Sequence, residues 1–164
     1  MSVPRFAIMT APLTVDRLAS ELEAAFRYGG EGCGAITTFV GVVRATHRGR
    51  RVKFLEYEAF TPLAMKAFER IGAEIAAEWP TAGVAIHHRV GRLDVGEASV
   101  AIAAAAAHRS EAFQVCRYAI ERVKQIVPVW KHEFFEDGDA WVEGAAADED
   151  DEAARARARE VACV

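Results

Sequence analysis

The chain has 164 residues and a formal net charge of −4, from 20 Lys and Arg and 24 Asp and Glu. Nucleic-acid-binding domains are usually strongly basic, so this balance argues against that class of protein. Hydrophobic residues make up 52% of the sequence, which is enough for a chain of this length to bury a core without disulfides or a structural metal.

The cysteines and the apolar runs indicate the compartment. Cys33, Cys116 and Cys163 are odd in number and form no CxxC pair, which favours reduced thiols in a cytosol. No apolar run reaches the ~18 residues of a membrane span, and residues 1–7 lack the core of a signal peptide. We therefore expect a soluble, cytoplasmic protein.

The first part of the chain predicts a helix and then a hairpin. Thr14 can cap the helix and the glycines at 29–30 can end it. Its apolar stripe comprises Leu18, Leu22, Ala25 and Phe26. Residues 35–43 are rich in β-branched side chains and predict a buried strand. The basic turn at 46–51 and a strand at 52–59 would complete an antiparallel hairpin with a mobile, cationic tip.

A second helix and two strands follow. Thr61 supplies an N-cap, the next residue is a proline suited to the first helical position, and Pro80 ends the helix. The inward-facing residues are Met65, Phe68, Ile71 or Gly72, Ile75 and Trp79. Strands are predicted at 84–90 and 99–107, joined by a turn at 93–96.

Ser110 is predicted to cap a third helix, which must end before Pro128 because proline disfavours helix in the residue before it. The apolar face of this helix comprises Phe113, Cys116, Ile120 and Val123. Residues 129–135 alternate as a strand, and residues 141–142 form a further short strand.

The composition changes near the C-terminus. From residue 145 onward alanines, acids and arginines dominate, so residues 145–164 are predicted to be a poorly ordered or marginally helical tail. The order of elements before it predicts one α+β domain over residues 1–144, with mainly antiparallel strand pairing.

Cationic residues near the ends of predicted elements are candidates for a ligand site. His108 and Arg109 directly precede the predicted N-terminus of the third helix, where free N–H groups and the helix dipole favour a phosphate or carboxylate. Arg44 ends the first predicted strand, from which a side chain can reach a ligand. The alternatives are a capping His, an exposed Arg and a solvated charge at a strand end.

Two lysines lie on either side of Pro128. Lys124 is near the C-terminal end of the third helix, where a lysine can also simply complement the helix dipole. Lys131 shares a strand face with Val129 and Glu133, and the alternative for it is a solvent-facing position in a half-buried strand. Together these cations suit a small anionic ligand.

Other chemistries lack support in the sequence. The histidines do not have the spacing of a zinc site, and no H-E-x-x-H or paired-Cys motif is present, so no metal is expected. Cys116 falls on an apolar helix face, where a thiol packs as a small hydrophobe rather than carrying a persulfide. No GxGxxG or Walker motif indicates a nucleotide cofactor.

Five collinear stretches resemble the molybdopterin synthase large-subunit family. They are GAITTFVGVVR at 34–44, IHHRVG at 86–91, AHRSEAF at 107–113, KQIVPVWKHE at 124–133 and GDAWVE at 138–143. Each is weak alone, but the five in order, within a match from residue 3 to residue 143, are specific. The chain departs from the family pattern after residue 143, where Gly144 and Ala145 replace a frequent arginine, and in its plain alanine run at 103–107.

The resemblance implies an α/β hammerhead fold with an added antiparallel β subdomain, and a two-fold dimer of large subunits. Each would bind one small ubiquitin-like subunit, giving a heterotetramer. The thiocarboxylate at that partner's Gly-Gly C-terminus would supply sulfur, with no permanently bound cofactor. The substrate would be cyclic pyranopterin monophosphate, and the product the dithiolene of molybdopterin, in molybdenum cofactor biosynthesis.

By motif position the resemblance also assigns site residues. Lys124 and Lys131 would be catalytic, and a lysine can act as a general acid or as a Schiff-base nucleophile. Arg44, His108 and Arg109 would hold the substrate and its phosphate. The complete substrate-binding set is Arg44, His108, Arg109, Lys124, Lys131 and Glu133.

The spacing along the third helix conflicts with a site inside one subunit. Arg109 and Lys124 are about 15 residues apart, or roughly 22 Å at ~1.5 Å per residue, which is too far for one small pterin to bridge. A two-fold dimer resolves the conflict if each site combines the lysines of one subunit with His108 and Arg109 of the other. The alternative functions are a partner-independent lyase or phosphoesterase acting on a phosphorylated pterin, and a non-catalytic docking module for a ubiquitin-like protein.

Overall fold

Two β-sheets and four helices form the described part of the chain, residues 3–27, 32–142, 144 and 148–163 of the computed structural model. The helices are α1 (Val15–Phe26), α2 (Thr61–Glu78), α3 (Arg109–Ile126) and α4 (Glu152–Ala162). The first sheet has the spatial order β1 (Phe6–Met9), β5 (Gly83–Arg89), β7 (Ala98–Ala106) and β2 (Ala35–Val42). The second sheet contains β3 (Thr46–His47), β4 (Arg50–Ala59), β8 (Val129–Phe135) and β9 (Gly138–Val142), with β6 (Gly91–Asp94) paired to β4.

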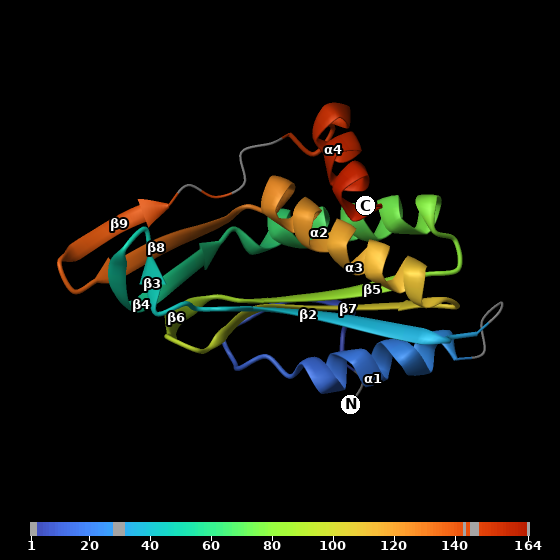
Figure 1. The fold of residues 1–164 in the computed structure, drawn as a ribbon, viewed down its shortest axis with the longest axis horizontal. Helices are drawn as coiled ribbons and strands as arrows, with labels where there is room; N and C mark the ends of the chain where they lie inside the picture. Colours follow the sequence, from blue (N-terminus) through green and yellow to red (C-terminus); the bar gives the residue numbers. More distant parts are fainter. Residues whose placement is uncertain (1–2, 28–31, 143, 145–147, 164) are drawn as a thin grey trace.

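The first sheet carries the main core between two layers of helices. Figure 1 shows α1 on one face of this sheet and α2 and α3 on the other, with the second sheet beyond one end. Alternate residues of β5 and β7 point to opposite layers, so Ile86 and Ile102 pack under α2 and α3, whereas Ala85 and Ala103 pack against α1. Truncating a fully buried core residue such as Ile71 to Ala costs about 2–5 kcal/mol.

Strand pairing is antiparallel except between β1 and β5, which are parallel. This mixed α/β architecture confirms the coarse prediction of fold class and of mainly antiparallel pairing. β1 and β6 have four residues each and were not predicted from the sequence. No helix within the described residues is long and apolar enough to cross a membrane.

The predicted hairpin between residues 35–43 and 52–59 is wrong. β2 pairs with β7 in the first sheet, and β4 pairs with β3, β6 and β8 in the second. The tight hairpin is instead β3–β4, whose turn places Arg48 and Gly49 at φ angles of 49° and 79°. Local patterning identified strand-forming residues but carried no information about which strands become partners.

β2 is an edge strand, so the prediction that it is buried is also wrong. Its outward row includes Ile36, Val40 and Val42, which are 39%, 38% and 53% exposed. The register of Ile36 with Ala105 and of Val40 with Ala101 of β7 places these two side chains on the same sheet face as α1, and the pairing shifts at an irregularity between Gly41 and Val42. The β-branched composition therefore reflects an apolar surface beside a sheet edge.

The N-caps of two helices lie one or two positions before the predicted ones. Phe60, not Thr61, occupies the N-cap of α2, and His108, not Ser110, occupies that of α3. Most residues of the predicted apolar helix faces are buried or partly buried, but Phe113 is 62% exposed and Ala25 is also exposed. The predicted end of the first helix at residues 29–30 lies outside the described residues.

The C-terminal segment, expected to be poorly ordered or marginally helical, contains helix α4. The Asp151 carboxylate caps it by accepting hydrogen bonds from two backbone N–H groups at 2.9 and 3.0 Å. Ala154, Ala158 and Ala162 recur every fourth residue and are buried, and α4 packs on α3. Small side chains at this spacing allow close helix packing without large apolar residues, which explains the difference from the expectation.

A buried ion pair connects α2 to α3. Arg122 is 0% exposed, and its Nη2 lies 2.8 Å from Oε1 of Glu74. Tyr118 donates a hydrogen bond of 2.8 Å to the other carboxylate oxygen. Burial favours a raised pKa for Glu74, but the hydrogen bonds from Arg122 and Tyr118 outweigh it and hold that pKa below its usual value. This pairing fixes the position of α3, whose two ends carry candidate site residues.

Candidate functional site

A cavity of about 750 Å³ opens where the two sheets meet. Its walls come from the end of β2 and the loop after it, from β4 and β8, and from the C-terminal half of α3. Four of the six residues predicted to bind substrate line it together: Arg44, Lys124, Lys131 and Glu133. The fold therefore gathers residues that are up to 89 positions apart in the sequence (44 to 133).

Strand alternation and a proline place the two lysines. On β8, Val129, Lys131 and Glu133 all line the cavity, which confirms their predicted shared face. α3 ends at Ile126, two residues before Pro128, so Lys124 in its last turn reaches the cavity from the helix side. The two lysines thus approach the same space from two different elements.

Glu133 is buried and holds two neighbours. Its side chain is 3% exposed, and its Oε1 lies 2.6 Å from Nζ of Lys131. Its Oε2 lies 2.5 Å from Nδ1 of His47, which belongs to β3. Burial favours a raised pKa for this carboxyl, but the hydrogen bonds from His47 and Lys131 outweigh it and hold the Glu133 pKa below its usual value.

The other two cations that line the cavity, Arg44 and Lys124, are not paired with another described residue. Neither Arg44 nor Lys124 makes an ion pair or side-chain hydrogen bond with another residue in the described part of the chain, and both side chains are exposed. Lys131, in contrast, is already paired with a carboxylate. Arg44 and Lys124 are therefore the charges that can turn to a ligand without breaking an existing contact.

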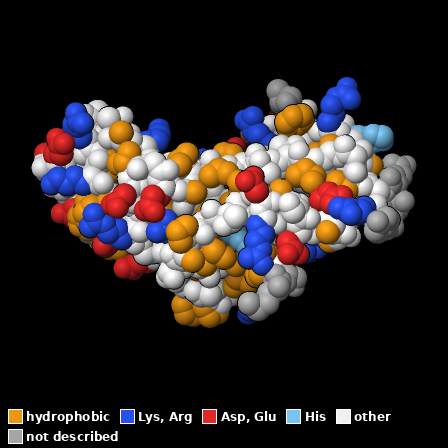
Figure 2. Space-filling view, turned by 90° about the horizontal axis from the view of Figure 1, so that it is seen from below, with side chains coloured by type: hydrophobic (Ala, Val, Ile, Leu, Met, Phe, Trp, Pro, Cys, Tyr) orange, Lys and Arg blue, Asp and Glu red, His pale blue; other side chains and the backbone are white. Residues whose placement is uncertain are grey.

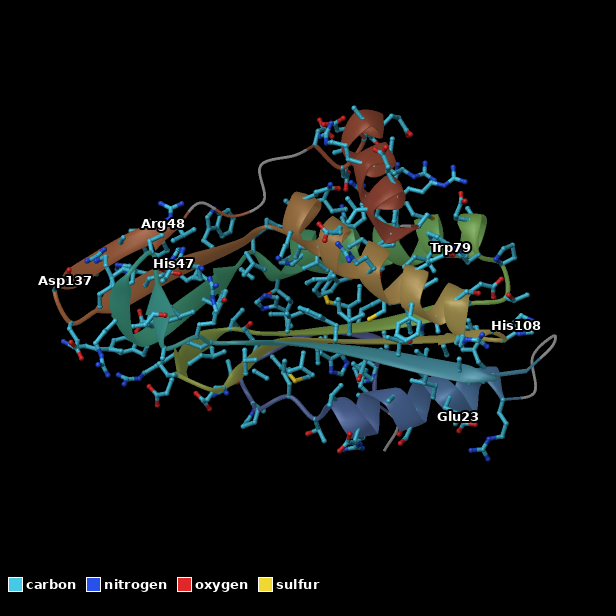
Figure 3. All side chains as sticks on the ribbon, viewed as in Figure 1. Glu23, His47, Arg48, Trp79, His108 and Asp137 are labelled. Carbon is cyan, nitrogen blue, oxygen red and sulfur yellow. The ribbon has the colours of Figure 1, made fainter. Side chains whose placement is uncertain are left out.

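His108 and Arg109 lie at the opposite end of α3 and do not line this cavity. Figure 3 shows His108 near one end of the molecule and His47, beside the cavity, toward the other. The helix between Arg109 and Lys124 spans roughly 22 Å at ~1.5 Å per residue. Within a single chain, the six predicted residues therefore form two separate groups.

Two histidines with no role predicted from the sequence, His47 and His88, also line the cavity. His47 is 86 residues away from its partner Glu133 in the sequence, and no local pattern links them. His88 had a weak signal: in the strand sequence IHHR only one of two adjacent histidines can face each side. Which side meets a cavity depends on the tertiary fold.

Cys116 is 4% exposed, and burial raises its pKa to about 11. It is therefore a neutral thiol at neutral pH, which confirms the prediction that it packs in the core. Among the described residues, no group of three or more His, Cys, Asp or Glu side chains is arranged to hold a metal ion.

The fold and this cavity define a mixed α/β protein in which three cations, Arg44, Lys124 and Lys131, line one cavity, a charge that suits a small anionic ligand. A cation that is held in place, as Lys131 is by Glu133, can stabilise negative charge that develops during a reaction. The family model described as MoaE protein matches residues 8–126. The chain belongs to this family, the catalytic subunits of molybdopterin synthase, which are sulfur-transferring enzymes of molybdenum cofactor biosynthesis.

Individual relatives support this membership over most of the chain. The molybdopterin synthase catalytic subunit of Bacillus subtilis is 46% identical over 138 residues, which is 84% of either chain. That of Halalkalibacterium halodurans is 43% identical over 142 residues, which is 87% of either chain. The crystal structure of molybdopterin synthase from Staphylococcus aureus matches with a TM-score of 0.77 and 37% identity, covering 85% of this chain and 98% of that one. These matches confirm the family predicted from the five sequence stretches.

Proposed function

We propose that this chain transfers sulfur from the thiocarboxylated C-terminus of a small ubiquitin-like carrier subunit to cyclic pyranopterin monophosphate, forming the dithiolene of molybdopterin. The observation that carries the proposal is the arrangement of charges in the cavity. Lys124 and Arg44 have no ion-pair partner among the described residues, and they line the same cavity as the ion pair of Lys131 and Glu133. Sulfur insertion opens a cyclic phosphate and expels oxygen, so negative charge must be stabilised and protons delivered. Cations in a partly enclosed site suit both tasks.

The two lysines have different surroundings and, we infer, different parts in the reaction. Lys124 has no ion-pair partner among the described residues, so it can approach the reacting atoms as a general acid or as a Schiff-base nucleophile. Lys131 is held by Glu133 at 2.6 Å, which fixes its ammonium as a local positive charge. Arg44 suits a phosphate contact, because its guanidinium can donate two parallel hydrogen bonds.

The sulfur must come from outside this chain. Cys116 is buried, and neither Cys33 nor Cys163 lines the cavity. A thiocarboxylate on a partner's flexible Gly-Gly C-terminus meets the need without a permanently bound cofactor. Reduced cysteines and this chemistry are consistent with a cytoplasmic location.

The separation of His108 and Arg109 from the lysines supports a site shared by two subunits. β2 is an open edge, and its end at Val42 adjoins the cavity, whereas its start at Ala35 pairs with Ala106, two residues before His108. If two copies of β2 pair antiparallel about a two-fold axis, the start of one strand meets the end of the other. An eight-residue strand is about 27 Å long at ~3.4 Å per residue, close to the separation along α3.

This pairing would also cover the apolar row of β2. Figure 2 views the molecule from the α1 side and shows hydrophobic side chains gathered across the middle of this face. Ile36 and Val40 belong to the exposed apolar residues on this side. We therefore propose a homodimer of this chain, and a heterotetramer with two carrier subunits. In the family's terms, the first sheet with its helices would be the α/β hammerhead domain and the second sheet the added β subdomain.

A sulfur-transfer assay tests the proposal. The purified chain, given the phosphorylated pterin alone or with sulfide, should form no dithiolene, and adding the thiocarboxylated carrier should start the reaction. Turnover of the pterin without the carrier would instead support a lyase or phosphoesterase. Carrier binding without any binding of the pterin would support a docking module.

A further inference from the structure

Two adjacent histidines on β5 have similar burial but different surroundings. His87 is 4% exposed and His88 is 6% exposed, and alternation along the strand directs them to opposite faces of the first sheet. The His87 ring bonds through Nε2 to the carbonyl oxygen of Pro4 at 2.7 Å. His88 instead lines the cavity that contains Lys124 and Lys131.

The hydrogen bonding of His88 fixes its tautomer. Its Nδ1 lies 2.9 Å from the carbonyl oxygen of Arg89. A carbonyl oxygen can only accept, so Nδ1 carries the proton and donates it. Burial lowers the His88 pKa to about 4, so the ring is neutral near pH 7 and its Nε2 can only accept a hydrogen bond.

The Nε2 atom of His88 is open to the cavity. It has no hydrogen-bond partner among the described residues. In that part of the chain no fully buried side-chain nitrogen or oxygen lacks a partner, so an unpartnered Nε2 must retain exposed surface. The Tyr57 ring packs edge-on against the imidazole, with centroids 5.2 Å apart, and also lines the cavity. This contact holds the ring in its orientation.

The charged side chains that line the same cavity act as donors or are already paired. Arg44 and Lys124 can only donate. Both carboxylate oxygens of Glu133 are engaged, and the Ser99 hydroxyl donates to the carbonyl of Gly41 at 3.2 Å. The cavity therefore combines donors for an anion with a fixed, neutral acceptor.

We propose that His88 is a specificity-determining residue, whose Nε2 accepts a hydrogen bond from a ring N–H or amino group of the substrate's heterocycle. This inference rests on the proposed function, in which the substrate is a phosphorylated pterin. A pterin offers N–H donors on its rings and an anion on its phosphate, and both match the cavity. A buried acceptor that meets a C–H or a second lone pair is left unsatisfied, so the site discriminates against heterocycles without a donor there.

Two matched substitutions test the role of the acceptor in the complete enzyme with its carrier. His88→Asn keeps an amide near the Nδ1 position but removes the atom that faces the cavity. It should raise the KM and the Kd of the pterin roughly fivefold to tenfold, the worth of one net hydrogen bond, and leave carrier binding unchanged. His88→Gln places an amide oxygen near the Nε2 position and should recover most of the loss. His87→Asn, at a similarly buried site on the opposite face, should leave KM unchanged.

A measurement on the unaltered protein covers the case in which a variant does not fold. In ¹⁵N NMR spectra the His88 Nε2 resonance should be that of an unprotonated acceptor, and it should move when the pterin saturates the site. An unmoved Nε2 resonance at saturation overturns the inference, as does an unchanged KM in His88→Asn or an equal rise in His87→Asn. If the wild-type protein binds no pterin, the proposed function fails and this inference fails with it. Normal wild-type turnover with an unaffected His88→Asn overturns this inference alone.

Discussion

Lys131 and Glu133 lie two residues apart on β8 and form an ion pair on the cavity face, with Nζ 2.6 Å from Oε1. The second oxygen of Glu133 bonds to His47 of β3, so one buried carboxylate joins two strands at the site. Both oxygens are engaged before any substrate arrives. Glu133, proposed from its motif to contact the substrate, is thus placed to position Lys131.

Replacing this carboxylate by an amide tests its positioning role. Glu133→Gln keeps the shape of the side chain but removes the charge that holds Lys131 and His47. We expect turnover to fall roughly 10–100-fold, because a catalytic group displaced by about 1 Å can cost this much. Steady-state kinetics should show the loss mainly in kcat. A loss confined to KM would mean that Glu133 contacts the substrate directly.

The same variant predicts a dependence of stability on pH. The folded-state pKa of Glu133 is lowered, so its pairing contributes stability that is present above the unfolded pKa of about 4.3 and is lost as pH falls through the folded value. The difference in Tm between wild type and Glu133→Gln should therefore be larger at pH 6 than below roughly pH 4, where it shrinks. Melting curves at several pH values measure it. A difference that grows on acidification would contradict this assignment.

Lys124 and Arg109 should differ in which kinetic constant they affect. Lys124→Ala should lower kcat roughly 10²-fold or more with little change in KM, if Lys124 acts in the transition state. Arg109→Ala should mainly raise KM, because it loses a bidentate phosphate contact. Lys66→Ala, an exposed lysine on α2 outside the cavity, is the control and should change neither constant. Equal kcat losses at unchanged KM in both variants would contradict these roles.

Mixed dimers test whether the site is shared between subunits. Arg109→Ala and Lys124→Ala each inactivate both sites of their own homodimer, but a mixed dimer would hold one doubly damaged site and one intact site. With random mixing half of the dimers are mixed, so about a quarter of all sites should recover. Activity of the equimolar mixture measures this, with mixed dimers verified by mass. No recovery despite verified mixing would place the whole site within one chain.

Helix α4 gives a prediction for stability. Ala158 is 1% exposed where α4 packs on α3, whereas Ala156 on the same helix is exposed. Ala158→Asp buries an unpaired charge and should cost about 3 kcal/mol, which lowers Tm by roughly 6–12 °C for a chain of this size. Ala156→Asp is the matched control and should shift Tm by no more than a degree or two. Equal Tm values for the two variants would show that α4 does not stabilise the domain, as the composition of the tail alone suggested.

The sequence by itself determined those features that depend on neighbouring residues. The apolar spacing of Phe68, Ile71 and Ile75 predicted the inward face of α2, because a helix repeats every 3.6 residues. Alternation predicted that Lys131 and Glu133 share a face, because successive strand residues point to opposite sides. The order of motifs identified the family.

Only the tertiary structure decided which surfaces meet. The β-branched residues of β2 fit a buried strand and an edge strand equally well, and strand partners form across long sequence separations. The pairing of His47 with Glu133, the opening of His88 to the cavity and the packing of α4 through small alanines each depend on a distant element. Local periodicity sets the direction in which a side chain points, but burial and charge pairing depend on what the whole chain places opposite it.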